Sequence, residues 1–381
     1  MNKNNLVLKS LSLLACLLLL TAGSVTFQDK LFISFLPYNI LILFFIMGFI
    51  VMYSTTSKLI EKDYLYYLFI LFIASLSIFY TEPTSEGLMK YFNLFVIVTL
   101  SLLLCSLINI EMQQLLRIII FFYFLIFILT FIFKLDDGVL NRESNYLVFG
   151  PIVFGRMMSV GFLAVQFSDL KKIKIPLMIC FLFGVFMSAS KGPLVSLFII
   201  ECFIIIVLYR KHINIKIFFI FIFILLSLIY IYSDYLLYDT RIGSAIIEVS
   251  DIISNEREIV ITETTPSVTI RLGMIVETLD LIYNYPFGVG IGNWPHITGL
   301  HWLEYPHNFI LEVFSEIGLL LGVIFLVPYF VFLRSRIDFL FAVSFFYLLS
   351  SLASGDVLDS RFLLFYSLLS TFIYKKTIKE I

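Results

Sequence analysis

Long runs of apolar residues, separated by short polar segments, make up most of this chain. A helix needs about 20 predominantly apolar residues to cross the hydrocarbon core of a bilayer. Twelve runs reach or approach that length. They predict an all-α, polytopic integral membrane protein with about 12 transmembrane helices in a single membrane domain over residues 1–381. The predicted spans are 7–25, 31–53, 64–80, 91–109, 117–133, 146–167, 175–189, 194–209, 215–233, 308–333, 338–353 and 360–374.

One polar segment, residues 234–306, is much longer than the others and separates the ninth and tenth spans. In its second half, Thr265 and Pro266 are typical of a helix N-cap and a first helical position. Apolar residues then recur at helical spacing and predict an amphipathic helix near 266–284, on or near the membrane surface, with Arg271 in its second turn. The apolar positions are Val268, Leu272, Ile275, Leu279 and Ile282.

Glycine occupies every second position from Gly288 to Gly292, in the sequence PFGVGIGNWP that follows the predicted helix. This spacing predicts a tight, irregular backbone. It does not match a dinucleotide-binding fingerprint, which requires a strand before the glycines and a helix after them. His296, His301 and His307 follow, but spacings of five and six residues do not place successive histidines on one helical face. A zinc site is therefore not favoured.

The composition agrees with a membrane protein and excludes an ordinary soluble domain. Of 381 residues, 60% are hydrophobic and 14% are charged, whereas soluble domains have about 45–50% apolar and about 25% charged residues. A formal net charge of −1 points to no nucleic-acid partner. All four cysteines lie in apolar runs, so we expect no disulfide framework.

Lysine and arginine set the predicted orientation. Cytoplasmic loops of membrane proteins carry an excess of these residues. With a cytoplasmic N-terminus, the inner segments of this chain hold most of the Lys and Arg residues. Both termini are therefore predicted to be cytoplasmic, and residues 234–306 form one large outward-facing loop.

Four charged residues lie well inside the predicted spans, away from the span ends: Arg156, Glu201, Glu312 and Glu316. Each costs about 2.5–3.5 kcal/mol on insertion scales, so such residues are rare unless they serve a purpose. Asn308, Glu312 and Glu316 are four residues apart and form one polar stripe that must face protein or water. Two interpretations remain open. Arg156 pairs with Glu201 or a glutamate of the stripe, or these residues line an outward-opening polar cavity that accepts a charged head group.

His307 and Lys191 are candidates for chemistry at the outer surface. Pro306 suits a first helical position, which places His307 in the first helical turn. The positive end of the helix dipole there disfavours imidazolium and attracts an anion, so a neutral His307 could accept a proton beside an anion. An interfacial histidine without chemistry is the alternative. Lys191, in the turn SASKGP, is either a phosphate ligand or a solvated loop lysine.

The pattern H-N-x-x-L-E-x-x-x-E-x-G at 307–318 resembles the signature of the bacterial O-antigen polymerase and O-antigen ligase superfamily. The resemblance extends to Arg271 in a helix that leads to the glycine run, and to the short turn around Lys191. Twelve spans with one large periplasmic loop between the ninth and tenth complete it.

This resemblance implies an inverting, metal-independent glycosyltransferase that needs no cofactor. Its donor and acceptor would be undecaprenyl-diphosphate-linked glycans, at the periplasmic face of the bacterial inner membrane. By analogy, Lys191 and Arg271 hold the donor's diphosphate, and His307 takes the proton from the acceptor hydroxyl. Arg156, Glu201, Asn308, Glu312 and Glu316 would support the polar cavity. The family commonly has arginine at the position of Lys191, and lysine keeps the charge but lacks the bidentate fork.

The polymerase is the first hypothesis, because polymerases are the more numerous and variable group. The named residues are shared with the ligase, which transfers a finished glycan to lipid A core. A capsule or exopolysaccharide polymerase fits equally well. A flippase or other transporter is less favoured, because the halves of the chain show no internal repeat. A chain-length regulator is a candidate partner rather than an identity for this chain, since regulators devote most of their length to a soluble domain.

Overall fold

The computed structural model describes residues 111–135, 150–208, 267–300, 305–357 and 359–379, together with residues 69, 72, 76, 77, 139, 146 and 303. The predicted spans 7–25, 31–53, 91–109 and 215–233 lie outside these residues, as do nearly all of 64–80 and the part of the long polar segment before residue 267. Every regular element in the described part of the chain is a helix, in agreement with the predicted all-α fold.

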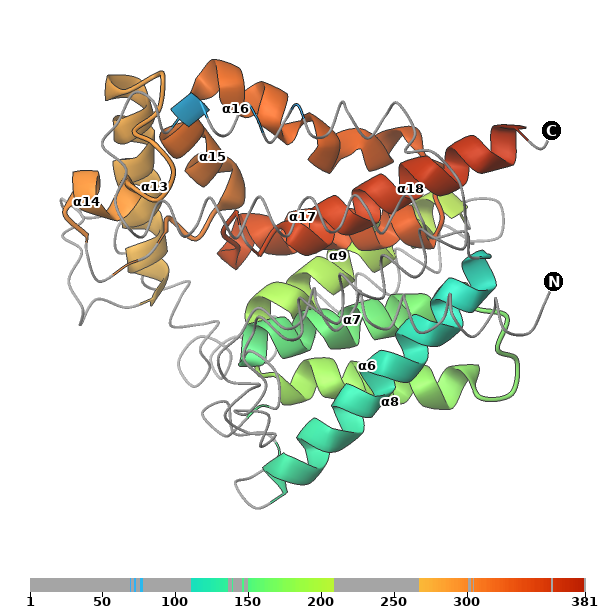
Figure 1. Ribbon diagram of the computed structural model, residues 1–381. Helices are drawn as coiled ribbons and strands as arrows, with labels where there is room; N and C mark the ends of the chain where they lie inside the picture. The colour runs from blue at the N-terminus through green and yellow to red at the C-terminus, as the bar shows by residue number, and fades with distance from the viewer. Residues whose placement is uncertain are drawn as a thin grey trace, which may run out of the picture.

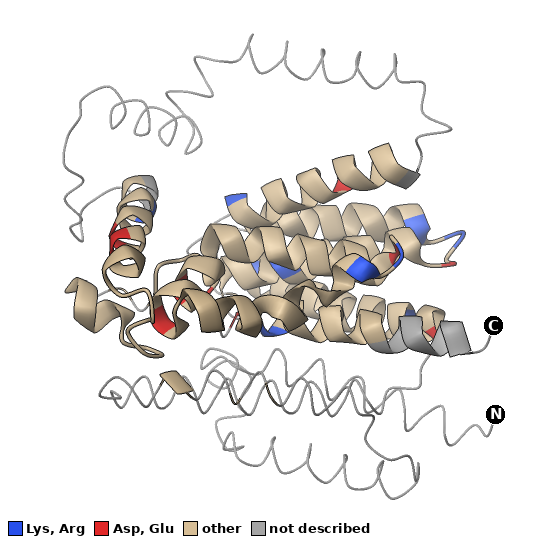
Figure 2. Ribbon diagram, turned by 90° about the horizontal axis from the view of Figure 1, so that it is seen from above, with Lys and Arg blue, Asp and Glu red and all other residues tan. Residues whose placement is uncertain are grey.

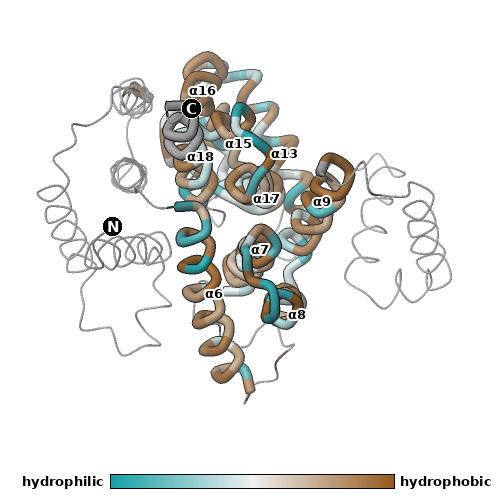
Figure 3. The backbone as a smooth tube through the Cα atoms, turned by 90° about the vertical axis from the view of Figure 1, so that its right-hand side faces the viewer, coloured by the Kyte–Doolittle hydropathy of each residue, from teal (hydrophilic) through white to brown (hydrophobic). Residues whose placement is uncertain are grey.

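Six of the described helices form a bundle, and α7 lies at its centre. These are α6 (Met112–Lys134), α7 (Pro151–Phe167), α8 (Lys174–Met187), α9 (Lys191–Leu208), α17 (Phe339–Ser354) and α18 (Arg361–Lys379). Viewed along the bundle, α7 is surrounded by α6, α8, α9 and α17 (Figure 3). Lys, Arg, Asp and Glu are sparse along the helices (Figure 2).

Small residues allow α7 and α8 to pack closely. Gly161 lies directly under the ring of Phe181, and a Cβ built on Gly184 would come within 2.7 Å of Met158 Cγ. Small residues at helix contacts are typical of membrane bundles, in which packing replaces the hydrophobic effect as the driving force. Most residues of α7 are accordingly buried.

Consecutive helices of the bundle run in opposite directions, and contacts at each end show it. At one end, Tyr146 Oη, just before α7, donates to the carbonyls of Met187 and Ser188 at the end of α8, at 3.1 and 3.3 Å. At the other end, Arg117 near the start of α6 pairs with Asp169 after α7 at 2.7 Å. We call these the Tyr146 end and the Arg117 end. They coincide with the predicted outer and inner sides.

By length and composition, α6 alone among the described helices is long and apolar enough to cross a membrane by itself. Four further apolar stretches are shorter: Pro151–Phe167, Lys174–Met187, Leu319–Arg334 and Phe339–Ser354. The described helices therefore agree with a membrane protein and leave the number of spans as a prediction.

The predicted span 308–333 is wrong as a single helix. The chain forms α15 (Phe309–Ile317), breaks at Gly318 with φ 93°, and continues as α16 (Leu319–Leu326) and the 3₁₀ helix η3 (Val327–Arg334). α15 runs across the Tyr146 end of the bundle, steeply inclined to α16 and α17 (Figure 1). Glu312 and Glu316 therefore lie in a helix that covers the end of the bundle, and the apolar stretch Leu319–Arg334 follows it.

The helix expected near 266–284 is present as α13 (Ser267–Asn284), and the short α14 (Trp294–Thr298) follows. Its buried face is rotated from the predicted one, since Leu279 is 51% exposed. A small second core explains the rotation, because Trp294 packs on this face and donates from Nε1 to Thr278 Oγ1 at 2.9 Å. The buried residues of this core are Met274, Leu281, Val289, Trp294 and Leu303.

The glycine run docks onto the end of α15. The N–H groups of Val289 and Gly290 donate to the carbonyls of Ser315 and Glu316, each at 2.8 Å, and Leu319 N–H donates to Pro286 O at 2.9 Å. The last carbonyls of a helix have no partner within it, so these bonds cap α15 from another segment. The backbones touch because Gly288 and Gly318 lack side chains, and a Cβ on Gly288 would come within 2.5 Å of Glu316 O.

Candidate functional site

Four segments meet at the Tyr146 end: the start of α7, the turn between α8 and α9, the start of α15 and the turn between α17 and α18. A Cβ built on Gly155 would lie 2.7 Å from Ser188 Oγ and 3.1 Å from Pro193 Cγ, which places the α8–α9 turn against α7. Asn308 Nδ2 donates to Leu352 O at 3.1 Å, which joins α15 to the end of α17.

Arg156 is the buried centre of this region, at 3% exposure. Its Nε donates to Ser350 Oγ at 2.7 Å, and its Nη1 donates to Asp359 Oδ2 at 3.1 Å. Nη2 donates to Ser350 O and Ser354 Oγ at 3.3 and 3.4 Å. Asp359 also faces Arg361, whose Nη1 lies 3.9 Å from its Oδ1.

The predicted pair of Arg156 with Glu201 or a glutamate of the stripe is wrong, because its carboxylate partner is Asp359. Glu201 instead accepts a hydrogen bond from Gln166 Nε2 at 3.0 Å. Gln166 is the penultimate residue of α7, towards the Arg117 end, so Glu201 does not share a site with Arg156. The predicted span began at residue 146, whereas α7 begins at Pro151, so Arg156 lies nearer the start of its helix than the prediction implied.

The polar stripe of Asn308, Glu312 and Glu316 faces protein, as expected, but its three residues have different surroundings. Asn308 is the N-cap, and its Oδ1 accepts from Ile310 N at 3.1 Å and Leu311 N at 3.2 Å. Glu312 is fully buried, and its Oε2 accepts from Val357 N at 2.9 Å. Glu316 is 1% exposed.

The helix start also differs from the prediction. Pro306 is not the first helical residue, because α15 begins at Phe309, and His307 precedes the Asn308 cap with a left-handed φ of 53°. A non-glycine residue with positive φ is uncommon and often marks a functional position. The aromatic rings of His307 and Tyr305 meet edge to face, with 4.5 Å between their centroids.

His307 is half-buried, and its Nδ1 has no hydrogen-bond partner among the described residues. Burial, reinforced by the positive charge of Arg271, lowers the pKa of His307 to about 4, against an opposing effect of Asp359. His307 is therefore neutral near pH 7. This direction agrees with the predicted neutral imidazole, although burial and Arg271 cause it rather than a helix start.

Two cations lie at the accessible margin of the site. Arg271 is exposed on α13 and acts electrostatically on His307. Lys191 is the exposed first residue of α9, and its neighbour Gly192 faces Ser354, with 3.8 Å from a built Cβ to Ser354 Oγ. Since Ser354 also contacts Arg156, the turn that carries Lys191 borders the Arg156–Asp359 pair.

The structure thus groups Arg156, Arg271 and His307 with Asp359, places Lys191 beside them and separates Glu201 from them. Sequence reasoning missed Asp359, Arg361 and Tyr305. A usable signal existed, because the segment GDVLDSR, which runs from the last predicted turn into the final predicted span, carries three charges. His296 is exposed on α14, and His301 lies outside the described residues. The described residues contain no group of three His, Cys, Asp or Glu side chains that could hold a metal ion.

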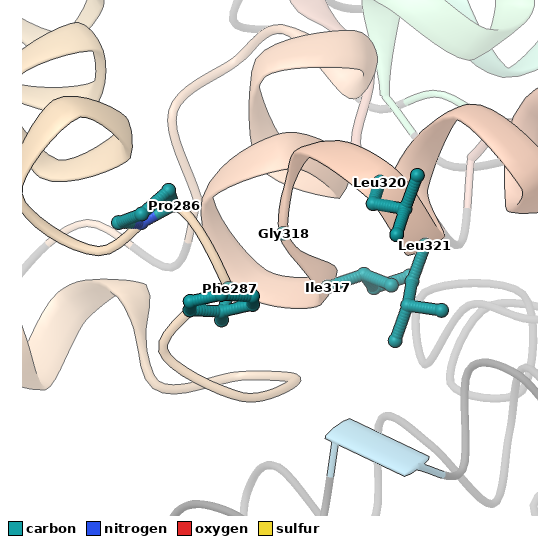
Figure 4. Close-up of a pocket in the computed structure, with 7 residues that line it drawn as sticks. Pro286, Phe287, Ile317, Gly318, Leu320 and Leu321 are labelled. Carbon is teal, nitrogen blue, oxygen red and sulfur yellow. The ribbon is translucent and has the colours of Figure 1, made fainter.

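A separate pocket of about 400 Å³ opens where the glycine run meets the break between α15 and α16 (Figure 4). Its lining consists of Pro286, Phe287, Gly288, Ile317, Gly318, Leu320 and Leu321. It contains no charged side chain, so it does not fit a diphosphate. The candidate site for charged groups is the polar cluster around Arg156 and His307.

The described part of the chain is thus an apolar helical bundle that carries a buried arginine, a neutral histidine and exposed cations at one end. Residues 176–326 match the protein family described as O-antigen ligase. This match supports the O-antigen ligase and polymerase superfamily, and it confirms the resemblance found in the sequence. Members of this family are membrane proteins and glycosyltransferase-like enzymes.

The matched region runs from α8 to the end of α16 and covers less than half of the chain. It contains Lys191, Arg271, His307 and Glu312, and it excludes Arg156 and Asp359. No curated protein matches the chain.

Proposed function

We propose that this protein is a polymerase of O-antigen or a related surface polysaccharide. It transfers a glycan from an undecaprenyl-diphosphate carrier to a hydroxyl of another lipid-linked repeat unit. The observation that carries the proposal is the grouping of neutral His307 with Arg271 and Asp359 in a chain that matches the O-antigen ligase family.

The reaction needs a proton acceptor and cations near the leaving group, and the site offers both. Arg271 and Lys191, both exposed, bind the donor's diphosphate. The acceptor oxygen forms a bond to the anomeric carbon with inversion, and the bond from that carbon to the phosphate oxygen breaks. The acceptor's proton goes to His307, and the undecaprenyl diphosphate leaves with the negative charge. Preorganised cations aimed at developing charge supply the largest stabilisation, and a base contributes typically about 10²–10⁴-fold.

The membrane arrangement belongs to the same proposal. The chain has 12 spans in the inner membrane with both termini cytoplasmic, and residues 234–306 form a periplasmic loop. Two findings support this arrangement. The described helices alternate in direction, and the polar cluster lies at the Tyr146 end, which the charge pattern assigns to the periplasmic side.

The ligase is the second candidate, because the matching family is itself described as O-antigen ligase. It would use the same donor site and differ in its acceptor, which is lipid A core. A flippase is less favoured, because transporters typically bind their substrate near the bilayer midplane. The polar cluster here lies at one end of the bundle.

A deletion of the gene, analysed as a ladder of cell-surface glycans, separates these candidates. We expect loss of all long chains while single repeat units remain attached. Loss of every attached repeat unit would identify a ligase instead. Loss of periplasmic repeat units would identify a flippase.

A further inference from the structure

Glu312 connects two parts of the candidate site that are distant in sequence. Its carboxylate is fully buried at the Tyr146 end, and Oε2 accepts the N–H of Val357 at 2.9 Å. Val357 belongs to the turn between α17 and α18. A buried carboxylate is costly, so one that accepts a backbone N–H from another segment is placed to fix that segment.

The turn that Glu312 holds is compact and carries the partner of Arg156. Asp356 Oδ1 accepts the N–H of Asp359, and Ser360 Oγ donates to Val357 O at 2.6 Å. These bonds join Asp356, Val357, Asp359 and Ser360 into a single unit. A displacement of Val357 therefore displaces Asp359, whose Oδ2 accepts from Arg156 at 3.1 Å.

α15 is tied to the end of α17 and the following turn at two points, both close to His307. Asn308 Nδ2 donates to Leu352 O at 3.1 Å, and Glu312 lies one helical turn further along. His307 directly precedes Asn308, so the same two ties set the place of His307 relative to Asp359.

We propose that Glu312 is a positioning residue that holds the turn carrying Asp359 against α15 and thereby fixes Asp359 and Arg156 relative to His307. This inference rests on the proposed function, since it assigns His307 the role of base. In this role Glu312 acts through the hydrogen bond that its Oε2 accepts from Val357 N–H, and that bond depends on the length of the side chain.

The hydrogen bonds of Asn308 and Glu312 to the end of α17 and the following turn also affect the electrostatic surroundings of His307. The charged groups that act on it are Arg271 on α13, which lowers its pKa, and Asp359 on the turn, which raises it. If the turn moves away, the influence of Asp359 weakens while that of Arg271 remains. The acidic limb of the rate profile then moves to lower pH. A loss of folded protein alone would change the amount of active enzyme and leave this limb in place.

The test compares Glu312→Gln with Glu312→Asp in purified full-length protein. The substrate is the lipid-linked repeat unit that accumulates in cells lacking the gene. Glutamine keeps the length and the acceptor oxygen, whereas aspartate keeps the charge but is one methylene shorter. We expect a loss in kcat of about threefold for glutamine and about 10- to 100-fold for aspartate, because small displacements of catalytic groups have effects of that size. The acidic limb of kcat/KM should move to lower pH in Glu312→Asp only.

Ser315→Ala is the matched control, because the Ser315 hydroxyl is buried in the same helix and, among the described residues, donates to the Glu312 carbonyl at 3.1 Å. The Ser315→Ala variant should leave both kcat and the acidic limb of kcat/KM unchanged. The positioning role is wrong if Glu312→Asp is at least as active as Glu312→Gln. It is also wrong if the acidic limb of kcat/KM in Glu312→Asp stays at the wild-type pH. His307→Ala separates this outcome from a failure of the proposed function, since an active His307→Ala enzyme contradicts the base itself.

Discussion

His307 is unusual in its backbone conformation, its burial and its electrostatic surroundings. It has a left-handed backbone, its Nδ1 is buried without a partner among the described residues, and Arg271 acts on it. A base must be deprotonated at the working pH, and a lowered pKa ensures this at some cost in basicity.

The lowered pKa of His307 predicts the pH dependence of chain extension. With the pKa of His307 lowered to about 4, the acidic limb of kcat/KM should lie near pH 4, well below the ordinary histidine value of about 6.5. Rates of chain extension measured from pH 4 to 8 with purified protein check this. A limb near pH 6.5 would show that His307 is not held neutral by its surroundings.

The two accessible cations give the second prediction. Arg271→Ala and Lys191→Ala should each lower chain extension by at least about 10-fold, because each removes a charge aimed at the diphosphate. Arg271→Lys should retain part of the activity, and Lys191→Arg should retain most of it, since both keep the charge. Arg117→Ala, an exposed arginine at the Arg117 end, is the control and should extend chains normally. Full activity of Arg271→Ala would show that Arg271 does not take part in binding the diphosphate.

At the scale of elements, the junction between the glycine run and α15 holds α13 and α15 together. Arg271 lies on α13 and His307 directly precedes the N-cap of α15, so the backbone contact between Gly288 and Gly318 sets how they approach one another. Gly288 has a φ of 86°, and a Cβ there would meet the Glu316 carbonyl at 2.5 Å.

Gly288→Ala should therefore destabilise the protein by about 2 kcal/mol or more, since it adds a backbone clash to a strained conformation. Thermal unfolding in detergent measures this effect. Gly299→Ala is the matched control, because Gly299 has a φ of 75° but open space around it, and its cost should be about 1 kcal/mol. Equal losses in the two variants would mean that the close approach at Gly288 contributes nothing.

Several elements were predictable from sequence because their signals are local. The helix near 266–284 follows from spacing, and the glycine alternation indicated an irregular backbone. The break at Gly318 was missed because a single glycine in an apolar run does not interrupt the hydrophobic pattern. The Arg156–Asp359 pair joins residues 203 positions apart, and no local pattern encodes such a contact.

At the scale of the whole molecule, the predicted orientation is supported by where the polar cluster lies and stays a prediction. Single cysteines in a protein whose four natural cysteines are replaced test it. Asn284→Cys, at the exposed end of α13, and Ser254→Cys should be labelled from the periplasm. Asp169→Cys, exposed at the Arg117 end, should be labelled only from the cytoplasm. Labelling of Asn284→Cys and Ser254→Cys only from the cytoplasm would show that the predicted orientation is wrong.

In the proposed function, this chain itself forms glycosidic bonds between lipid-linked repeat units with His307 as the base. The direct measurement reconstitutes the purified protein in lipid vesicles with undecaprenyl-diphosphate-linked repeat units and follows chain length. Wild-type protein should produce a ladder of longer chains and release undecaprenyl diphosphate, and His307→Ala should produce neither although it inserts normally. A ladder from His307→Ala at the wild-type rate, or no chain extension by the wild-type protein, would contradict the account.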